Sequence, residues 1–293
     1  MTHTRRPPAP RTAGEMLAMA RTFLERKQVE EARLEAELLI AHALDIDRLG
    51  LFMQLDRPIE APDVDAARDL LVRRGRREPV AYITGRREFY GRSFEVGPGV
   101  LIPRPETELL VDLARERCPE PADRRAADLG CGSGCIGVTL ALELPGLAVW
   151  GFDRSEDALA FTGLNAERLG AELKLAGGDG FEALAMAVAE HGLFHLLLCN
   201  PPYVRPEERA DLAPEVRDFE PDLALYAPAG DPDSWVRELI ARSRELVLPG
   251  GHVLVELGAD QASRARALAG EFRLEVALHT DLAGIERVLE LQV

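Results

Sequence analysis

The sequence lacks the long apolar run, of roughly 18 residues, that a membrane-spanning helix needs. It also lacks an excess of positive charge, because 35 Lys and Arg residues stand against 50 Asp and Glu residues, for a formal net charge of −15. A broad basic surface for nucleic acid is therefore not expected, although a local basic patch remains compatible with this balance. These two absences argue against a membrane protein and against direct binding of nucleic acid.

Cysteine and histidine are scarce and scattered. The cysteines, at positions 118, 131, 135 and 199, show no C-x-x-C spacing, and the six histidines show no metal-ligand spacing. We therefore expect free thiols in a reducing cytoplasm and no metal site. Residues 1–12 contain prolines and arginines but no apolar segment, and we interpret them as a disordered tail rather than a signal peptide.

The length and composition predict one large domain and one small domain. The chain has 293 residues, of which 46% are hydrophobic and 29% charged, as in an ordinary globular protein. Over residues 13–78, apolar residues recur every three or four positions, which predicts a small helical domain that holds or presents a partner. The basic cluster Arg73–Arg77 is typical of a solvent-exposed helix end, and a partner contact is an equally open interpretation.

A change of pattern follows this helical region. Residues 79–104 combine β-type side chains with four glycines, which predicts a hairpin linker. The segment Leu101–Glu108 then leads into a helix, because a proline near the first turn is followed by carboxylates. Arg104, between two prolines of this segment, is a candidate for lining a substrate channel.

From residue 105 to 293 strands and helices alternate. This predicts a doubly wound α/β sheet of seven strands with an antiparallel last strand, which is the class I methyltransferase architecture. The expected strands are residues 126–130, 149–153, 173–176, 196–199, 253–257, 274–278 and 287–293, and the expected helices are 135–144, 155–169, 234–247 and 261–268.

A glycine-rich loop follows the first of these strands. It consists of Gly130, Cys131, Gly132, Ser133 and Gly134, and glycines let a backbone pass close to a ligand at the start of a helix. Asp153 ends the next strand, where a carboxylate can accept hydrogen bonds from both ribose hydroxyls. Because residues 132–137 also satisfy the dinucleotide G-x-G-x-x-G pattern, these features alone indicate only an adenosine-type cofactor.

Three residues at the end of the third expected strand are candidates for binding an adenine ring. Asp179 could accept from the adenine amino group, and Phe181 could cover the ring face beside Gly180. A role of Asp179 as a turn or cap residue is equally consistent with the sequence.

The tetrapeptide Asn200-Pro201-Pro202-Tyr203 follows the fourth expected strand. The two prolines end the strand and leave Asn200 at its carboxyl end, where open α/β sheets bind ligands. The Asn200 oxygen and the Pro201 carbonyl could accept the two hydrogens of a planar amide or amino nitrogen and point its lone pair at an electrophile. Tyr203 could supply an aromatic wall. This tetrapeptide and the D-L-G-x-G-x-G form of the loop favour S-adenosylmethionine over NAD.

Over nearly its whole length, the chain resembles the release factor glutamine methyltransferases (the HemK/PrmC family). The residues that carry the resemblance are 78–85, 88–90, 101–108, 128–134, Asp153, 200–203, 219–221 and 281–287. The resemblance implies methyl transfer from S-adenosylmethionine to the N5 side-chain amide nitrogen of the glutamine in the Gly-Gly-Gln motif of peptide chain release factors. It also implies a helical domain that contacts the release factor.

The resemblance assigns residues to both partners of the reaction. It implies that Gly130–Gly134 and Asp153 bind the cofactor and that Asn200–Tyr203 bind the target glutamine. Two departures concern the adenine side: the family often has a large aromatic residue where Gly180 stands, and residues 229–235 lack the usual glycine-rich form.

Three alternative functions remain open from the sequence. A glutamine methyltransferase acting on a ribosomal protein would share the chemistry. An adenine-N6 methyltransferase would share the Asn-Pro-Pro-Tyr element but should display a basic groove. An NAD-dependent oxidoreductase would share only the glycine loop.

Overall fold

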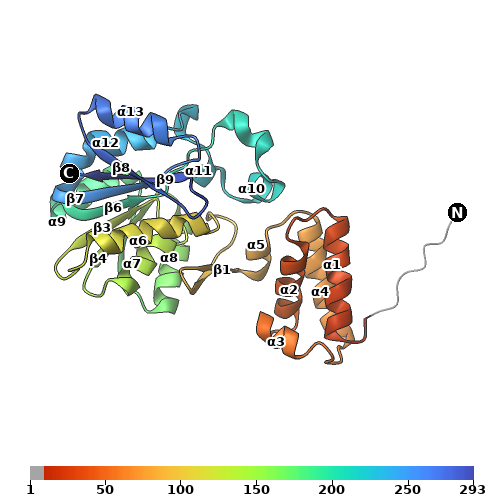
Figure 1. The fold of residues 1–293 in the computed structure, drawn as a ribbon. Helices are drawn as coiled ribbons and strands as arrows, with labels where there is room; N and C mark the ends of the chain where they lie inside the picture. The colour runs from red at the N-terminus through yellow and green to blue at the C-terminus, as the bar shows by residue number, and fades with distance from the viewer. Residues whose placement is uncertain (1–9) are drawn as a thin grey trace. The chain divides into compact units, whose positions relative to one another are not determined.

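The computed structural model describes residues 10–293, which form two compact units, one ending at Gly85 and the other spanning Arg86–Val293 (Figure 1). The expectation of a disordered tail falls largely on residues 1–9, outside the described part of the chain. Within residues 10–293, no helix is long and apolar enough to cross a membrane.

The first unit is helical, as predicted. Its helices are α1 (Ala13–Arg26), α2 (Ala32–Ala43), α3 (Arg48–Met53), α4 (Ala61–Gly75) and α5 (Val80–Thr84). Their apolar faces enclose one core that includes Leu24, Leu39 and Ile40, all inaccessible to solvent. In the basic cluster, Arg74 is buried and pairs with Glu35, while Arg73 pairs with Glu78. These two arginines therefore stabilise the unit itself.

The prediction of a hairpin linker over residues 79–104 was wrong for Val80–Thr84. These residues form α5, which starts after Pro79 and ends at Gly85, whose φ of 75° is left-handed. Ile83 is buried in the helical core, so tertiary packing outweighs the β-type character of these side chains. The hairpin itself is confirmed as β1 (Arg86–Phe89) and β2 (Arg92–Glu95). Its turn residues Tyr90 and Gly91 both have positive φ, as a type I′ turn requires.

The second unit contains the predicted seven-stranded doubly wound sheet. The strand order is β5-β4-β3-β6-β7-β9-β8, and β9 alone runs opposite to the other six strands. The strands are β3 (Arg125–Leu129), β4 (Ala148–Asp153), β5 (Leu173–Gly177), β6 (Phe194–Cys199), β7 (Val247–Glu256), β8 (Val276–Thr280) and β9 (Glu286–Gln292). Because the order reverses between β3 and β6, the carboxyl ends of these strands form the crevice in which such sheets bind ligands.

Helices cover both faces of this sheet (Figure 1). One face packs against α6 (Glu108–Arg117), α7 (Cys135–Glu143) and α8 (Glu156–Leu169), and the other against α9 (Gly180–His191), α12 (Ser234–Leu246) and α13 (Ala262–Glu271). The sequence did not predict α9. Short helical turns that were also unforeseen follow β6: η2 (Pro206–Asp211), α10 (Pro214–Phe219), α11 (Asp222–Leu225) and η3 (Pro228–Gly230). The predicted helix start after Leu101 is confirmed as η1 (Pro105–Thr107), which leads into α6.

Candidate active site

A cavity of about 630 Å³ opens at the carboxyl ends of β3, β4 and β6, where the strand order reverses. Its volume is in the range of small-molecule and cofactor sites. Nine predicted site residues line it: Gly130, Gly132, Asp153, Asp179, Gly180, Phe181, Asn200, Pro201 and Pro202. The fold therefore brings together residues that are up to 72 positions apart in the chain.

The glycine loop has the backbone conformation that only glycine adopts readily. Gly130, Gly132 and Gly134 have φ values of 76°, 56° and 79°, all in the left-handed region. At Gly134 a side chain is also excluded by space, since an added Cβ would lie 2.8 Å from the Thr162 Cγ2 atom. At Gly130 an added Cβ would meet nothing within 4 Å, so the backbone there faces open space.

Asp153 is held by the loop that it faces. Its Oδ2 accepts a hydrogen bond from the Gly132 N–H at 2.9 Å, and its Oδ1 accepts one from the Ser155 N–H at 2.9 Å. Each carboxylate oxygen keeps a second lone pair, and the residue lines the cavity. A diol with two donors, such as a ribose, fits this arrangement.

Three loop residues assigned to the cofactor do not line the cavity. Cys131 and Ser133 are buried, and Gly134 is the N-cap residue of α7. The Thr162 hydroxyl donates to the Gly132 carbonyl at 3.0 Å and lies 3.4 Å from the Cys131 sulfur. These three residues shape the loop from behind, and their contact with a ligand stays a prediction.

Asn165 supports the same loop and was missed from the sequence. Its side-chain nitrogen donates to the carbonyls of Ser133 and Glu95, each at 2.9 Å, and its oxygen accepts from the Glu95 N–H at 2.7 Å. The residue is fully buried in α8, so all of its hydrogen-bonding groups are directed by the fold. An asparagine inside an apolar helix face is the sequence signal that could have found it.

The wall next to Gly180 is aromatic. Phe181 and Trp235 both line the cavity, with ring centroids 5.0 Å apart. An added Cβ at Gly180 would lie 2.9 Å from the Leu129 Cδ1 atom and 3.8 Å from the Trp235 ring, so a side chain at this position would require the Leu129 side chain to shift. Trp235, from the start of α12, was not predicted. It supplies an aromatic surface close to Gly180.

Asp179 has the capping role that the sequence allowed and also faces the cavity, while its contact with an adenine stays a prediction. It is the N-cap of α9, accepting a hydrogen bond from the Phe181 N–H at 3.2 Å, and it lines the cavity. The capping contact orients the carboxylate at the helix start, where the helix dipole favours negative charge.

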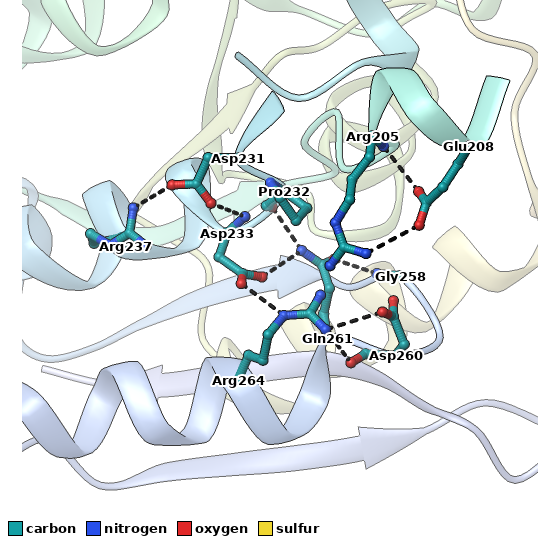
Figure 2. A network of polar contacts seen from close by, with 10 residues as sticks. All are labelled: Arg205, Glu208, Asp231, Pro232, Asp233, Arg237, Gly258, Asp260, Gln261 and Arg264. Carbon is teal, nitrogen blue, oxygen red and sulfur yellow. Dashed lines mark hydrogen bonds and ion pairs between the residues drawn. The ribbon is translucent and has the colours of Figure 1, made fainter. Parts of the chain in front are cut away.

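A polar network centred on Gln261 fixes the segment that carries Trp235 (Figure 2). The buried Gln261 side chain accepts from the Gly258 N–H at 2.6 Å and donates to the Pro232 carbonyl at 2.7 Å and to Asp233 at 3.1 Å. Arg264 donates to Asp233 at 2.8 Å in the same network. The loop before α12 is thereby tied to the turn after β7.

The Asn-Pro-Pro-Tyr corner lies where the sequence predicts it, directly after β6. Asn200, Pro201 and Pro202 line the cavity, whereas Tyr203 does not. Tyr203 packs instead against Gly258, where an added Cβ would lie 3.1 Å from its ring, and burial raises the pKa of its hydroxyl. A wall contact of Tyr203 with a ligand stays a prediction.

The Asn200 side chain has a partner that the sequence did not identify. Its Nδ2 donates to the Thr107 hydroxyl at 3.2 Å, and that hydroxyl donates to Glu256 at 2.6 Å. Glu256 is the last residue of β7, and burial raises its pKa to about 7. An acidic residue at the end of an apolar strand was the available signal.

Arg104 forms an ion pair rather than a wall of the cavity. Its guanidinium pairs with the buried carboxylate of Glu220 at 2.5 Å, and that carboxylate also accepts from the Ile102 N–H at 3.0 Å. Arg104 does not line the cavity, although the neighbouring Leu101 does. The contact of Arg104 with a substrate stays a prediction.

Comparisons with known proteins identify both parts of the chain. Residues 15–85 match the family model for the PrmC N-terminal domain, and residues 105–216 match that for the methyltransferase small domain. A release factor glutamine methyltransferase from Geobacter sulfurreducens is 42% identical over 251 residues, which cover 86% of each chain. One from Chlorobaculum tepidum is 39% identical and covers 94% of this chain and 95% of its own.

A solved structure supports the fold. The hMettl16 catalytic domain, in complex with the MAT2A 3′UTR hairpin 1, aligns with a TM-score of 0.56 over 80% of this chain and 81% of its own. At 16% identity, this similarity concerns the architecture alone.

Proposed function

The chain belongs to the release factor glutamine methyltransferase family, and on this basis we propose that it methylates the side-chain amide nitrogen (N5) of the glutamine in the Gly-Gly-Gln motif of peptide chain release factors. The methyl donor is S-adenosylmethionine. The observation that carries the proposal is the joining, in one cavity, of a glycine loop with its carboxylate and of the Asn200 corner.

The cofactor would lie along the β3 and β4 side of the cavity. Asp153 is oriented to accept from the ribose hydroxyls, and the backbone at Gly130 and Gly132 lets the methionine part approach closely. Phe181 and Trp235 offer ring faces to the adenine, and Asp179 offers an acceptor for its amino group.

The target glutamine would lie at the β6 side. The side-chain oxygen of Asn200 and the carbonyl of Pro201 would accept the two amide hydrogens. The direction of that carbonyl is restricted, because the Pro201 ring fixes φ and the following Pro202 limits ψ. This orients the weakly available lone pair of the nitrogen towards the methyl carbon. As positive charge grows on the nitrogen, the same two acceptors stabilise the transition state.

The reaction is a single in-line displacement on the methyl carbon. The nitrogen–carbon bond forms as the carbon–sulfur bond breaks, and the nitrogen then loses a proton to water. The sulfonium is already a strong electrophile, so the protein acts mainly by alignment, and the proposed chemistry uses no metal.

Recognition of the protein substrate is assigned to the helical domain, residues 13–78, and catalysis to residues 105–293. The relatives are named for release factors, which supports that substrate over a ribosomal protein, and the family supports methyl transfer over hydride transfer. A release factor as substrate supports a location in the cytoplasm.

Purified release factors incubated with the protein and isotope-labelled S-adenosylmethionine test this function. We expect one methyl group on the glutamine of the Gly-Gly-Gln peptide, located by fragmentation mass spectrometry. A release factor with that glutamine replaced by glutamate is the control and should stay unlabelled. Label on any other residue, or none on the wild-type factor, would contradict the proposal.

A further inference from the structure

We infer that Thr107 and Glu256 are positioning residues that determine which end of the Asn200 carboxamide faces the cavity. The inference rests on the proposed function, in which the Asn200 oxygen accepts a hydrogen from the target nitrogen. It assigns a role to two buried polar residues from segments far from Asn200 in the sequence.

The sheet register places these residues together. Strands β6 and β7 pair in parallel with Cys199 opposite Val255, so that Asn200 and Glu256 follow at adjacent strand ends. Thr107 is the last residue of η1. Asn200 Nδ2 lies 3.2 Å from the Thr107 Oγ1, and the Thr107 Oγ1 lies 2.6 Å from the Glu256 Oε2. Thr107 and Glu256 are each only 2% exposed, so water does not compete for these contacts.

The Glu256 carboxylate, the Thr107 hydroxyl and the Asn200 carboxamide form a chain of hydrogen bonds in which donor and acceptor roles are fixed. An ionised carboxylate only accepts, so it takes the single hydroxyl proton of Thr107. The Thr107 oxygen can then only accept, and the Asn200 group that faces it must be the NH₂. The Asn200 oxygen is thereby left for the cavity. The two ends of a carboxamide are nearly the same size, so steric contacts alone would hardly prevent the amide from flipping. The hydrogen-bond constraint therefore selects the orientation.

The surroundings of Glu256 link this direction to pH. Burial raises its pKa to about 7, while the hydrogen bond from Thr107 and the positive charges of Arg287 and Arg104 favour its ionised form. The other titratable groups that face it are Glu106, Tyr203, Cys199 and Cys135. A protonated Glu256 can donate, so the direction of the chain is lost as the pH falls below about 7.

Substitutions at Thr107 separate the hydroxyl from the packing. Thr107→Val keeps the shape and removes the hydroxyl, and we expect single-turnover methyl transfer to fall about tenfold, the loss of roughly one or two hydrogen bonds. Thr107→Ser restores the hydroxyl and should recover most of the rate. Thr139→Val is the matched control, because the Thr139 hydroxyl is also buried but has no hydrogen-bond partner among the described residues. Affinity for S-adenosylhomocysteine, measured by calorimetry, should stay unchanged in all three variants.

Glu256→Gln tests the direction itself, because a carboxamide can both donate and accept. We expect a lower rate that no longer declines as the pH is taken from 8 to 6, whereas the wild-type rate declines over this range. If the wild-type enzyme methylates the release factor and Thr107→Val does so at the same rate, the inference is overturned. A Glu256→Gln variant that keeps the wild-type acid decline would do the same.

A spectroscopic measurement needs no release factor, because the sequence contains only two asparagines, Asn165 and Asn200. In protein labelled with [¹⁵N]asparagine, we expect two side-chain amide signals, and the Asn200 proton that faces Thr107 should exchange slowly. In Thr107→Val it should exchange faster, while Asn165 stays unchanged. If the Asn200 protons exchange equally fast in the wild type and in Thr107→Val, the positioning role is refuted, whether or not the protein methylates a release factor. If exchange is slow in the wild type and faster in Thr107→Val, but no methyl transfer is found, only the proposed function is refuted.

Discussion

The two sides of the cavity are built in different ways. On the cofactor side, at β3 and β4, one contiguous glycine loop presents its backbone, and the carboxylate that holds it comes only 21 residues later. On the acceptor side, at β6 and β7, the Asn200 side chain depends on Thr107, 93 positions away, and Thr107 depends on Glu256, 149 positions away. The cofactor side therefore relies on backbone conformation, and the acceptor side on side chains joined by the tertiary fold.

This difference predicts that substitutions on the acceptor side mainly lower the rate of methyl transfer, whereas substitutions on the cofactor side mainly lower cofactor affinity. The largest effect is expected for Asn200→Ala, which removes a preorganised acceptor of the target nitrogen and should lower methyl transfer by about 10²-fold or more. Affinity for S-adenosylmethionine should change little. Single-turnover rates at saturating cofactor and calorimetric titration measure the two quantities. A variant with nearly normal turnover would remove Asn200 from the acceptor side.

Asp153→Ala should show the opposite pattern. The variant loses a charged acceptor for the ribose hydroxyls and also releases the Gly132 N–H. We expect cofactor affinity to fall about 10- to 100-fold, the cost of hydrogen bonds to a charged group, with a smaller effect on turnover at saturation. Unchanged affinity in calorimetry would show that the ribose lies elsewhere.

Trp235 can report ligand binding on the cofactor side by fluorescence, because it is one of only two tryptophans in the chain. The other, Trp150, is buried in the core between Phe194 and His191. We expect S-adenosylhomocysteine to change the tryptophan fluorescence of the wild-type protein and to leave that of Trp235→Phe unchanged. Trp235→Ala should weaken binding about tenfold through lost stacking, and Trp235→Phe by less. A fluorescence change that survives in Trp235→Phe would place the adenine away from this wall.

The last prediction concerns stability, rather than activity, on the acceptor side. The pKa of Glu256 rises from 4.5 to about 7 on folding, so its favourable contribution is present below pH 4.5 and is lost as the pH rises through about 7. Glu256→Gln should therefore gain stability relative to the wild type at pH 8, by up to about 3 kcal/mol, and gain much less at pH 5. Urea unfolding at both pH values measures this. Equal differences at the two pH values would show that Glu256 does not titrate on folding.

Much of the fold could be predicted from local pattern. The alternation of strands and helices predicted the seven-stranded sheet with its antiparallel last strand, because apolar runs bounded by turn residues identify buried strands. Val80–Thr84 could not be assigned from the same kind of pattern. Their β-type side chains are buried by a helix, and only the core around Ile83 selects that conformation.

The residues of the candidate site likewise fall into those that a local motif predicts and those that depend on remote segments. The sequence was enough to predict several residues that line the cavity, because each motif combines its chemistry with a strand end over a few consecutive residues: Gly130, Gly132, Asp153, Asn200, Pro201 and Pro202. Trp235, Asn165 and Thr107 could not be predicted in this way, because each acts on a segment that is remote in the chain. The packing of Leu129 and Trp235 next to Gly180 likewise arises only in the folded protein.

The sequence by itself determined the chemistry: a glycine loop that can bind a nucleoside cofactor and an amide followed by two prolines that can hold a planar nitrogen. Only the tertiary structure decided how that amide is oriented, because a carboxamide has two ends of nearly equal size. The choice between them is made by a hydroxyl and a buried carboxylate that the sheet register and the η1 turn bring beside it.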